Sequence, residues 1–151
     1  MYELVTPKVI IGGTDQEAAR RWLAAVHAWL LEQGPPARLV SGLELPAAGS
    51  NYASVEVITA DRRLLRLVFN GAADLVAASD DEGEAPLAEL DFTEVPHSHV
   101  FTSAGYRVLR VRELCAQIPP PALEQLPKPL RREIRYHGAE RVGDLVFNWF
   151  D

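Results

Sequence analysis

Residues 52–69, YASVEVITADRRLLRLVF, contain two runs of strand-forming residues around the short segment Ala60-Asp61-Arg62. If that segment is the loop, Glu56 lies opposite Arg66, and apolar pairs occupy the other face: Val55 with Leu67 and Val57 with Leu65. A slip of one residue would move every side chain to the wrong face, so the register is well specified. The stretch therefore predicts a β-hairpin.

An amphipathic helix is predicted before the hairpin, over about residues 15–33. Thr14-Asp15-Gln16-Glu17 has the pattern of a capping box, in which the Thr14 hydroxyl and the Glu17 carboxylate satisfy each other's backbone amides. Apolar residues then recur at helical spacing, and Gly34-Pro35-Pro36 ends the run. The inner face of this helix carries Trp22, Val26, Trp29 and Leu30.

Further strands are predicted after the hairpin, which favours an antiparallel sheet in the middle of the chain. The stretches that look extended are 72–78, 87–95, 99–101 and 106–111. Residues 2–11 are also rich in β-formers and predict one strand, or two short strands broken at Pro7.

Short helices are predicted at the C-terminal end, over residues 130–136 and 140–150. Prolines at 119–121 indicate a loop rather than a linker, because the thirty residues that follow cannot form a core alone. The expected fold is α+β: an antiparallel sheet packed against the N-terminal helix, with short C-terminal helices, in a single domain over residues 1–151.

Composition narrows the classes of function. The 151 residues are 48% hydrophobic and 24% charged, which is typical of a globular protein, and the formal net charge of −6 argues against binding to nucleic acid or to an anionic membrane. No stretch is apolar enough to span a membrane, and the N-terminus does not have the pattern of a signal peptide, so a cytoplasmic location is expected. The single cysteine, Cys115, excludes an internal disulfide and is expected to be buried, with an exposed reactive thiol near Arg110 and Arg112 as the alternative.

Acidic residues are concentrated in one stretch. Residues 70–106 contain eight carboxylates and no lysine or arginine. Such a stretch is typical of a solvated loop, or of a docking surface that attracts a basic partner. The candidate partner-binding residues are Asp80, Asp81, Glu82, Glu84, Glu89 and Asp91.

Motifs for chemistry are weak. The sequence assigns no catalytic residue, no cofactor and no metal site, although His97 and His99 on an extended segment would share a side and could bind a metal with Glu94 or Asp91. The alternative to a docking function is therefore a small enzyme, or a small-ligand or metal-binding protein. Its pocket would lie between the sheet and the tryptophan-lined helix, with Trp22, His27, His97 and His99 as candidates.

The C-terminal segment, residues 131–151, is the most distinctive. Its ending, VGDLVFNWFD, resembles the closing segment of small bacterial proteins with a Val-Gly-Asp/Glu-x-x-Phe-Asn-x-Trp/Phe-Asp pattern, some of which are associated with toxin–immunity systems. The resemblance implies an immunity protein and supplies no catalytic residues. Phe147, Trp149 and Phe150 are expected to close the core, with an exposed aromatic contact as the alternative; Asn148 and Asp151 are expected to bond to backbone.

The leading hypothesis is accordingly a protein-binding module, an immunity or antitoxin-like protein that occludes a basic toxin, such as a nuclease, with its acidic surface. The sequence leaves open the identity of the partner and the oligomeric state.

Overall fold

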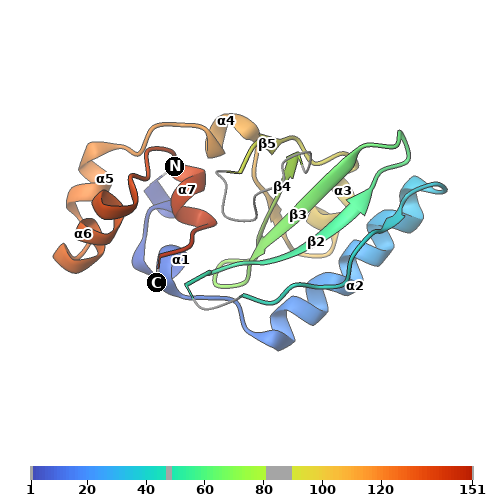
Figure 1. The fold of residues 1–151 in the computed structure, drawn as a ribbon, viewed down its shortest axis with the longest axis horizontal. Coiled ribbons are helices and arrows are strands. Elements are labelled where there is room, and N and C mark those ends of the chain that lie inside the picture. Colours follow the sequence, from blue (N-terminus) through green and yellow to red (C-terminus); the bar gives the residue numbers. More distant parts are fainter. Residues whose placement is uncertain (1, 47–48, 81–89, 151) are drawn as a thin grey trace.

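A computed structural model describes residues 2–46, 49–80 and 90–150. A twisted sheet forms the centre of the molecule, one long helix covers one face of it, and short helices from both ends of the chain gather at one end (Figure 1). The fold is α+β, as predicted. No helix within the described ranges is long and apolar enough to cross a membrane.

The sheet has six strands. Five are antiparallel neighbours in chain order, namely β1 (Arg38–Leu39), β2 (Ala53–Ile58), β3 (Leu64–Asn70), β4 (Leu75–Asp80) and β5 (Phe92–Thr93). The sixth strand, β6 (Arg107–Val108), pairs with β4 in parallel. The middle of the chain therefore forms a mostly antiparallel sheet. The extended conformation of β6 was predicted within residues 106–111, but its parallel pairing with β4 was not.

The predicted hairpin is confirmed in register. β2 and β3 pair Glu56 with Arg66, Val55 with Leu67 and Val57 with Leu65. The guanidinium of Arg66 lies 3.3 Å from the Glu56 carboxylate, on the face opposite the apolar pairs. The charge pattern and the apolar pattern of the sequence thus select the same pairing.

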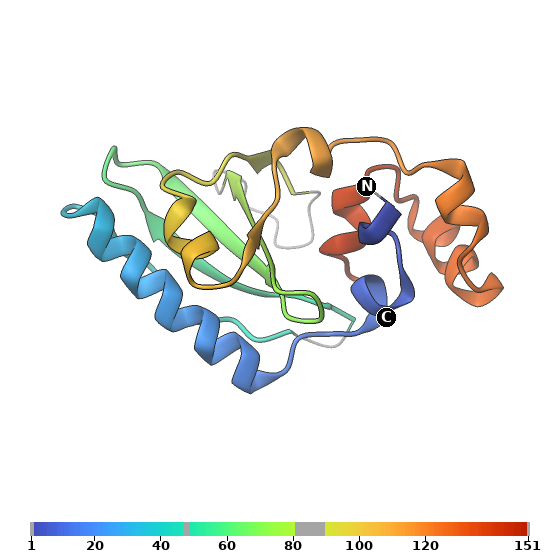
Figure 2. The same ribbon diagram turned by 180° about the vertical axis from the view of Figure 1, so that it is seen from behind.

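The long helix α2 (Gln16–Gln33) covers the apolar face of the sheet, together with α3 (His99–Ser103), and Figure 2 shows the two helices side by side. Trp22 stacks on Phe69 at 5.1 Å between ring centroids, and Trp29 packs against Phe101 at 5.8 Å. The predicted helix is confirmed, but α3 is helical where residues 99–101 were predicted to be extended. Tertiary burial of Phe101 outweighs the local β-propensity there.

The predicted capping box is wrong. The N-cap of α2 is Asp15, whose Oδ1 accepts the amide of Ala18 at 2.7 Å. The Thr14 hydroxyl instead donates to the carbonyl of Asn51 and accepts the amide of Gly71, both at 2.8 Å. Thr14 therefore ties the start of α2 to the sheet.

The predicted N-terminal strand is also wrong. Residues 2–11 form a 3₁₀ turn (Tyr2–Leu4) and the short helix α1 (Pro7–Ile11). Thr6 is the N-cap and Pro7 occupies the first helical turn, where its missing amide hydrogen costs nothing. The β-branched Val9 and Ile10 are buried, so packing rather than propensity sets this conformation.

Four short helices complete the chain, namely α4 (Val111–Leu114), α5 (Pro120–Glu124), α6 (Lys128–His137) and α7 (Val142–Val146). The predicted helix at 130–136 is confirmed in α6, whereas the one predicted over 140–150 ends at Val146. These helices and α1 pack around a second apolar cluster. The face of the sheet opposite α2 contributes Val68 and Ala77 to this cluster. Cys115, predicted to be buried, is exposed at the end of α4, because Leu114 takes the buried position beside it.

Three buried asparagines hold the chain ends against the sheet. The Asn51 amide nitrogen lies within 3.2 Å of the carbonyls of Val9, Ile10 and Val146, and Asn70 donates to Val9 and Val146. Asn148 donates to Ile10 and Leu145, and its own amide reaches the Asn51 side chain. These bonds satisfy the carbonyls at the ends of α1 and α7, which lack partners within such short helices. They also fix residues 147–150 against the sheet.

Candidate functional site

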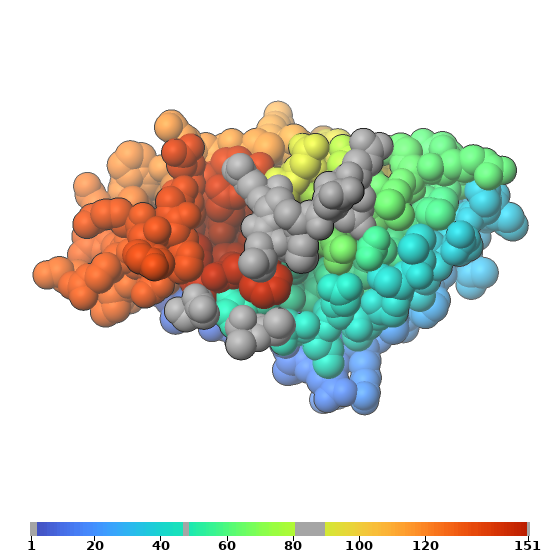
Figure 3. Space-filling model, viewed as in Figure 1, coloured from blue at the N-terminus to red at the C-terminus, as the bar shows by residue number. Residues whose placement is uncertain are grey.

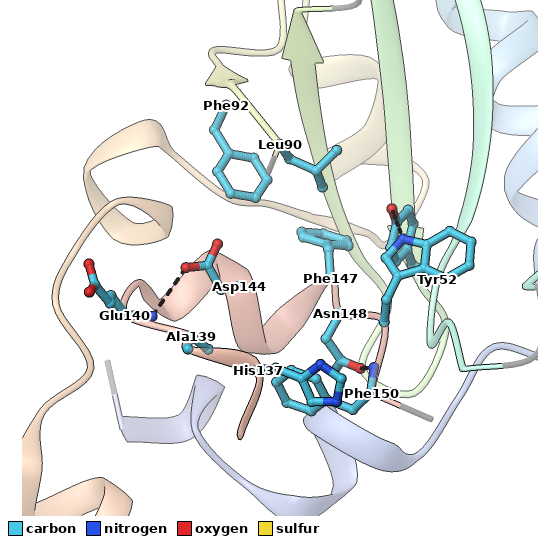
Figure 4. A pocket seen from close by; sticks show the side chains of 12 residues that line it. Tyr52, Leu90, Phe92, His137, Ala139, Glu140, Asp144, Phe147, Asn148 and Phe150 are labelled. Atoms are coloured by element: carbon cyan, nitrogen blue, oxygen red, sulfur yellow. Dashed lines mark hydrogen bonds between the residues drawn. The ribbon is translucent and has the colours of Figure 1, made fainter. Parts of the chain in front are cut away.

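A pocket of about 480 Å³ lies where the sheet meets the C-terminal segment. In the view of Figure 3 the C-terminal elements, orange to red, and the strands, green to cyan, lie on opposite sides of this face. The pocket is lined by Tyr52, Leu90, Phe92, His137, Gly138, Ala139, Glu140, Asp144, Phe147, Asn148, Trp149 and Phe150 (Figure 4). Its size is within the range of small-molecule sites in proteins.

Aromatic rings make up much of the lining. Tyr52 meets Phe147 and Trp149 edge to face, with centroids 5.8 and 6.3 Å apart, and Phe92 lies 6.1 Å from Phe147. The indole nitrogen of Trp149 donates to the Tyr52 hydroxyl at 2.9 Å. Burial raises the pKa of Tyr52, so its hydroxyl stays protonated beyond the ordinary range of a tyrosine.

One acidic group of the lining is already fully bonded. Asp144 Oδ1 accepts two bonds from the Arg141 side chain, at 2.7 and 3.1 Å, and Oδ2 accepts the amides of Glu140 and Arg141. The Arg141 guanidinium also lies over the Phe92 ring, 4.9 Å from its centroid. Asp144 is therefore a helix cap and half of an ion pair.

The rim of the pocket carries the remaining polar groups. The carboxylate of Glu140 is exposed and has no hydrogen-bond or ion-pair partner among the described residues. His137 stacks on Phe150 at 4.9 Å between centroids, and its Nε2 lies 3.4 Å from Glu133. A pocket that is lined by aromatic rings and by the Glu140 carboxylate suits an organic cation.

Two of the six predicted partner-binding residues lie in the described part of the chain, and they are neighbours. Asp80 ends β4 and Asp91 precedes β5; the amide of Asp80 donates to the carbonyl of Asp91 at 2.9 Å. Arg63 partly neutralises Asp80 through an ion pair at 3.3 Å and also donates to Thr93. The other four residues, Asp81, Glu82, Glu84 and Glu89, lie outside the described residues.

The imbalance of charge belongs mainly to the undescribed residues. Five of the 21 acidic residues lie outside the described ranges, whereas all 15 basic residues lie inside them, so the described part carries a formal charge of only −1. Basic side chains also gather locally, since four of the ten residues of α6 are lysine or arginine.

The predicted histidine pair has neighbouring rings but no metal-binding set. The rings of His97 and His99 are 6.2 Å apart, and His99 lies 3.5 Å from Glu32 on α2. Glu94 instead accepts the amide of Val111 at 2.6 Å. Within the described ranges, no three His, Cys, Asp or Glu side chains gather closely enough to hold a metal ion.

The pocket of about 480 Å³ lies elsewhere than beside the tryptophan-lined helix, where the sequence predicted a pocket. Trp22 and Trp29 are completely buried against Phe69 and Phe101, and His27 is on the exposed side of α2. The cavity described above is instead formed on the other face of the sheet, by segments far apart in the sequence. Sequence reasoning missed Tyr52, Phe92, His137 and Glu140, and the run of aromatic residues at 147–150 was the signal that pointed to this region.

The C-terminal motif has a structural role at most of its positions. A Cβ at Gly143 would lie 2.4 Å from the Phe92 ring, Asp144 caps α7, and Phe147 is 4% exposed. Asn148 bonds to backbone as predicted, while Trp149 and Phe150 are half-buried against the core; Asp151 lies outside the described residues. The motif therefore closes the fold and also lines the pocket.

Comparisons of the chain with protein-family models, with curated proteins and with solved structures found no match.

Proposed function

We propose that the protein is a protein-binding module of the immunity type, which neutralises a basic toxin, such as a nuclease, through the acidic surface at the β4–β5 edge. The adjacent placement of Asp80 and Asp91 carries this proposal. The sequence between these two positions contains Asp81, Glu82, Glu84 and Glu89. The acidic stretch therefore begins and ends at neighbouring positions of the sheet.

Electrostatics supports a basic partner. A concentrated negative surface speeds the encounter with a cationic protein, and the effect weakens as salt screens the charges. The nucleic-acid groove of a nuclease is cationic, and carboxylates can take the positions of phosphates there. The C-terminal resemblance supports the immunity role.

The test is capture of the partner at low salt from cells that carry the gene. We expect one basic protein to bind the wild-type chain in a one-to-one ratio, to inhibit growth when expressed alone, and to be harmless when the wild-type chain is co-expressed. The variant Glu84→Lys/Asp91→Lys should associate about ten times more slowly and protect poorly.

The matched control is Glu32→Lys/Glu124→Lys, which changes the net charge equally at exposed sites on α2 and α5. If both variants lose protection equally, the loss is due to the change in net charge and not to the acidic surface. A captured partner that is acidic, or full protection by Glu84→Lys/Asp91→Lys, would contradict the proposal.

A further inference from the structure

We infer that the pocket between the sheet and the C-terminal segment receives an arginine side chain of the basic partner. This inference rests on the proposed function, because it names the side chain by which that partner is anchored. The occupant is identified by the chemistry of the lining: aromatic rings, and the Glu140 carboxylate at one end of the pocket (Figure 4).

The aromatic lining favours a flat cation. A guanidinium stacks on aromatic faces, is less strongly hydrated than an ammonium group, and is attracted to the negative face of each ring. The chain already contains one such contact at the wall of the pocket, where Arg141 lies over Phe92. A second guanidinium can make the same contact with the ring of Trp149, which is half-buried and lines the same space.

The charge at the rim has the matching sign. Arg141 balances Asp144, so this pair contributes no net charge. Glu140 adds a carboxylate with no partner among the described residues. A carboxylate such as that of Glu140 can accept two parallel bonds from a guanidinium, which an ammonium group cannot provide.

The position of the pocket connects it to the acidic edge. Leu90 belongs to the lining and directly precedes Asp91 in the chain. The Leu90 carbonyl accepts a bond from Arg141 at 3.0 Å, which fixes the start of β5 against α7. A partner that docks on the acidic edge therefore reaches the pocket with the same surface.

The walls are held in place before binding. Asn148 is 4% exposed and bonds to Ile10 and Leu145, and Trp149 is bonded to Tyr52. Little of the lining needs to become ordered on binding, which lowers the entropic cost of taking up a single side chain.

The experiment uses three short peptides and needs no partner protein. Acetyl-Gly-Arg-Gly-amide, its lysine analogue and its citrulline analogue are titrated into the full chain, and binding is followed by NMR at the Trp149 indole N–H. Trp149 is the only tryptophan of the three that is not fully buried, so it reports on the pocket. Citrulline keeps the shape of arginine without its charge.

We expect saturable shifts with the arginine peptide, at the Trp149 indole and at the amides of Gly138 and Ala139. The citrulline and lysine peptides should bind roughly tenfold more weakly, as the loss of a cation–π contact and of a paired carboxylate implies. Glu140→Gln should weaken arginine binding severalfold, whereas Glu124→Gln, an exposed acid on α5 away from the pocket, should not change it.

The inference is overturned if the arginine peptide gives no saturable shift, if citrulline or lysine binds as well, or if Glu140→Gln binds unchanged. Its failure is distinct from that of the proposed function, because the peptides probe the pocket alone, whereas the charge reversals at Glu84 and Asp91 leave every pocket residue intact. If the arginine peptide binds the pocket but no basic partner is captured, the proposed function is wrong. If a basic partner is captured but the peptide does not bind, the inference about the pocket is wrong.

Discussion

The side-chain amide of Asn148 donates a 2.8 Å hydrogen bond to the backbone carbonyl of Ile10, across 138 residues of the chain. This bond joins the segment after α7 to α1, and the Asn51 side chain bonds to the backbone of both Ile10 and Asn148. Because the groups are buried, each side-chain amide that is lost removes hydrogen bonds that water cannot replace.

Asn148→Ala is therefore expected to lower the free energy of unfolding by about 3 kcal/mol, since the carbonyl of Leu145 and the amide of Phe150 lose the Asn148 side chain and the carbonyl of Ile10 keeps only its bond from Asn51. Urea unfolding followed by circular dichroism measures the change. Gln125→Ala, at an exposed amide, is the control and should shift the value by less than about 0.5 kcal/mol. An equal effect of both substitutions would rule out the network as a source of stability.

Gly143→Ala is expected to destabilise the fold by about 1–3 kcal/mol, because the added methyl group would overlap the Phe92 ring and lie 2.9 Å from the carbonyl of Leu114. Thermal unfolding provides the measurement. Gly42→Ala, where nothing lies within 4 Å of the new Cβ, serves as the matched substitution. Unchanged stability of Gly143→Ala would show that α7 does not pack against Phe92 as described.

Tyr52 links stability to alkaline pH. Its pKa is raised by burial in the folded state, so the unfolded chain releases this proton first as the pH rises. The contribution of the protonated Tyr52 hydroxyl to the free energy of unfolding is complete below the pKa of tyrosine in the unfolded chain, near 10. This contribution is lost as the pH rises through the pKa of Tyr52 in the folded state. Tyr52→Phe should therefore lose less stability than wild type between neutral pH and the alkaline range, in urea titrations at each pH. Tyr136→Phe, which changes a ring that is 83% exposed, is the control and should show the wild-type dependence of stability on pH. A Tyr52→Phe variant that also shows the wild-type dependence would contradict the raised pKa of Tyr52.

Cys115 is expected to react fully with a thiol reagent in the native state, because it is exposed at the end of α4. Ellman's reagent under native conditions should titrate one thiol per chain without prior unfolding. Reaction only after the addition of denaturant would place the cysteine inside the core, as its apolar sequence neighbours suggested.

Local patterns predicted the elements whose own sequence determines them. The β2–β3 register follows from alternating residues on both strands, and α2 follows from helical spacing with clear ends. Residues 2–11 and 99–101 were assigned wrongly because their β-forming side chains are used to fill the core from a helix. In such short segments, tertiary contacts outweigh propensity.

The pocket was beyond sequence reasoning for a related reason. Tyr52, Phe92 and Glu140 come from three separate segments, and the register of β4 with β5 and the buried asparagines bring those segments together. The role of Asn148 as a backbone donor was foreseen from its place in the motif, but its partners at Ile10 and Asn51 were not.

The central claim is that a basic partner docks on the acidic β4–β5 edge. The most direct measurement is the association rate constant of the captured partner, determined by stopped flow at a series of NaCl concentrations for wild type and for Glu84→Lys/Asp91→Lys. The account predicts a steep decrease with salt for wild type, and a slower and flatter dependence for the variant. Identical rates and identical salt dependence in the two proteins would contradict it.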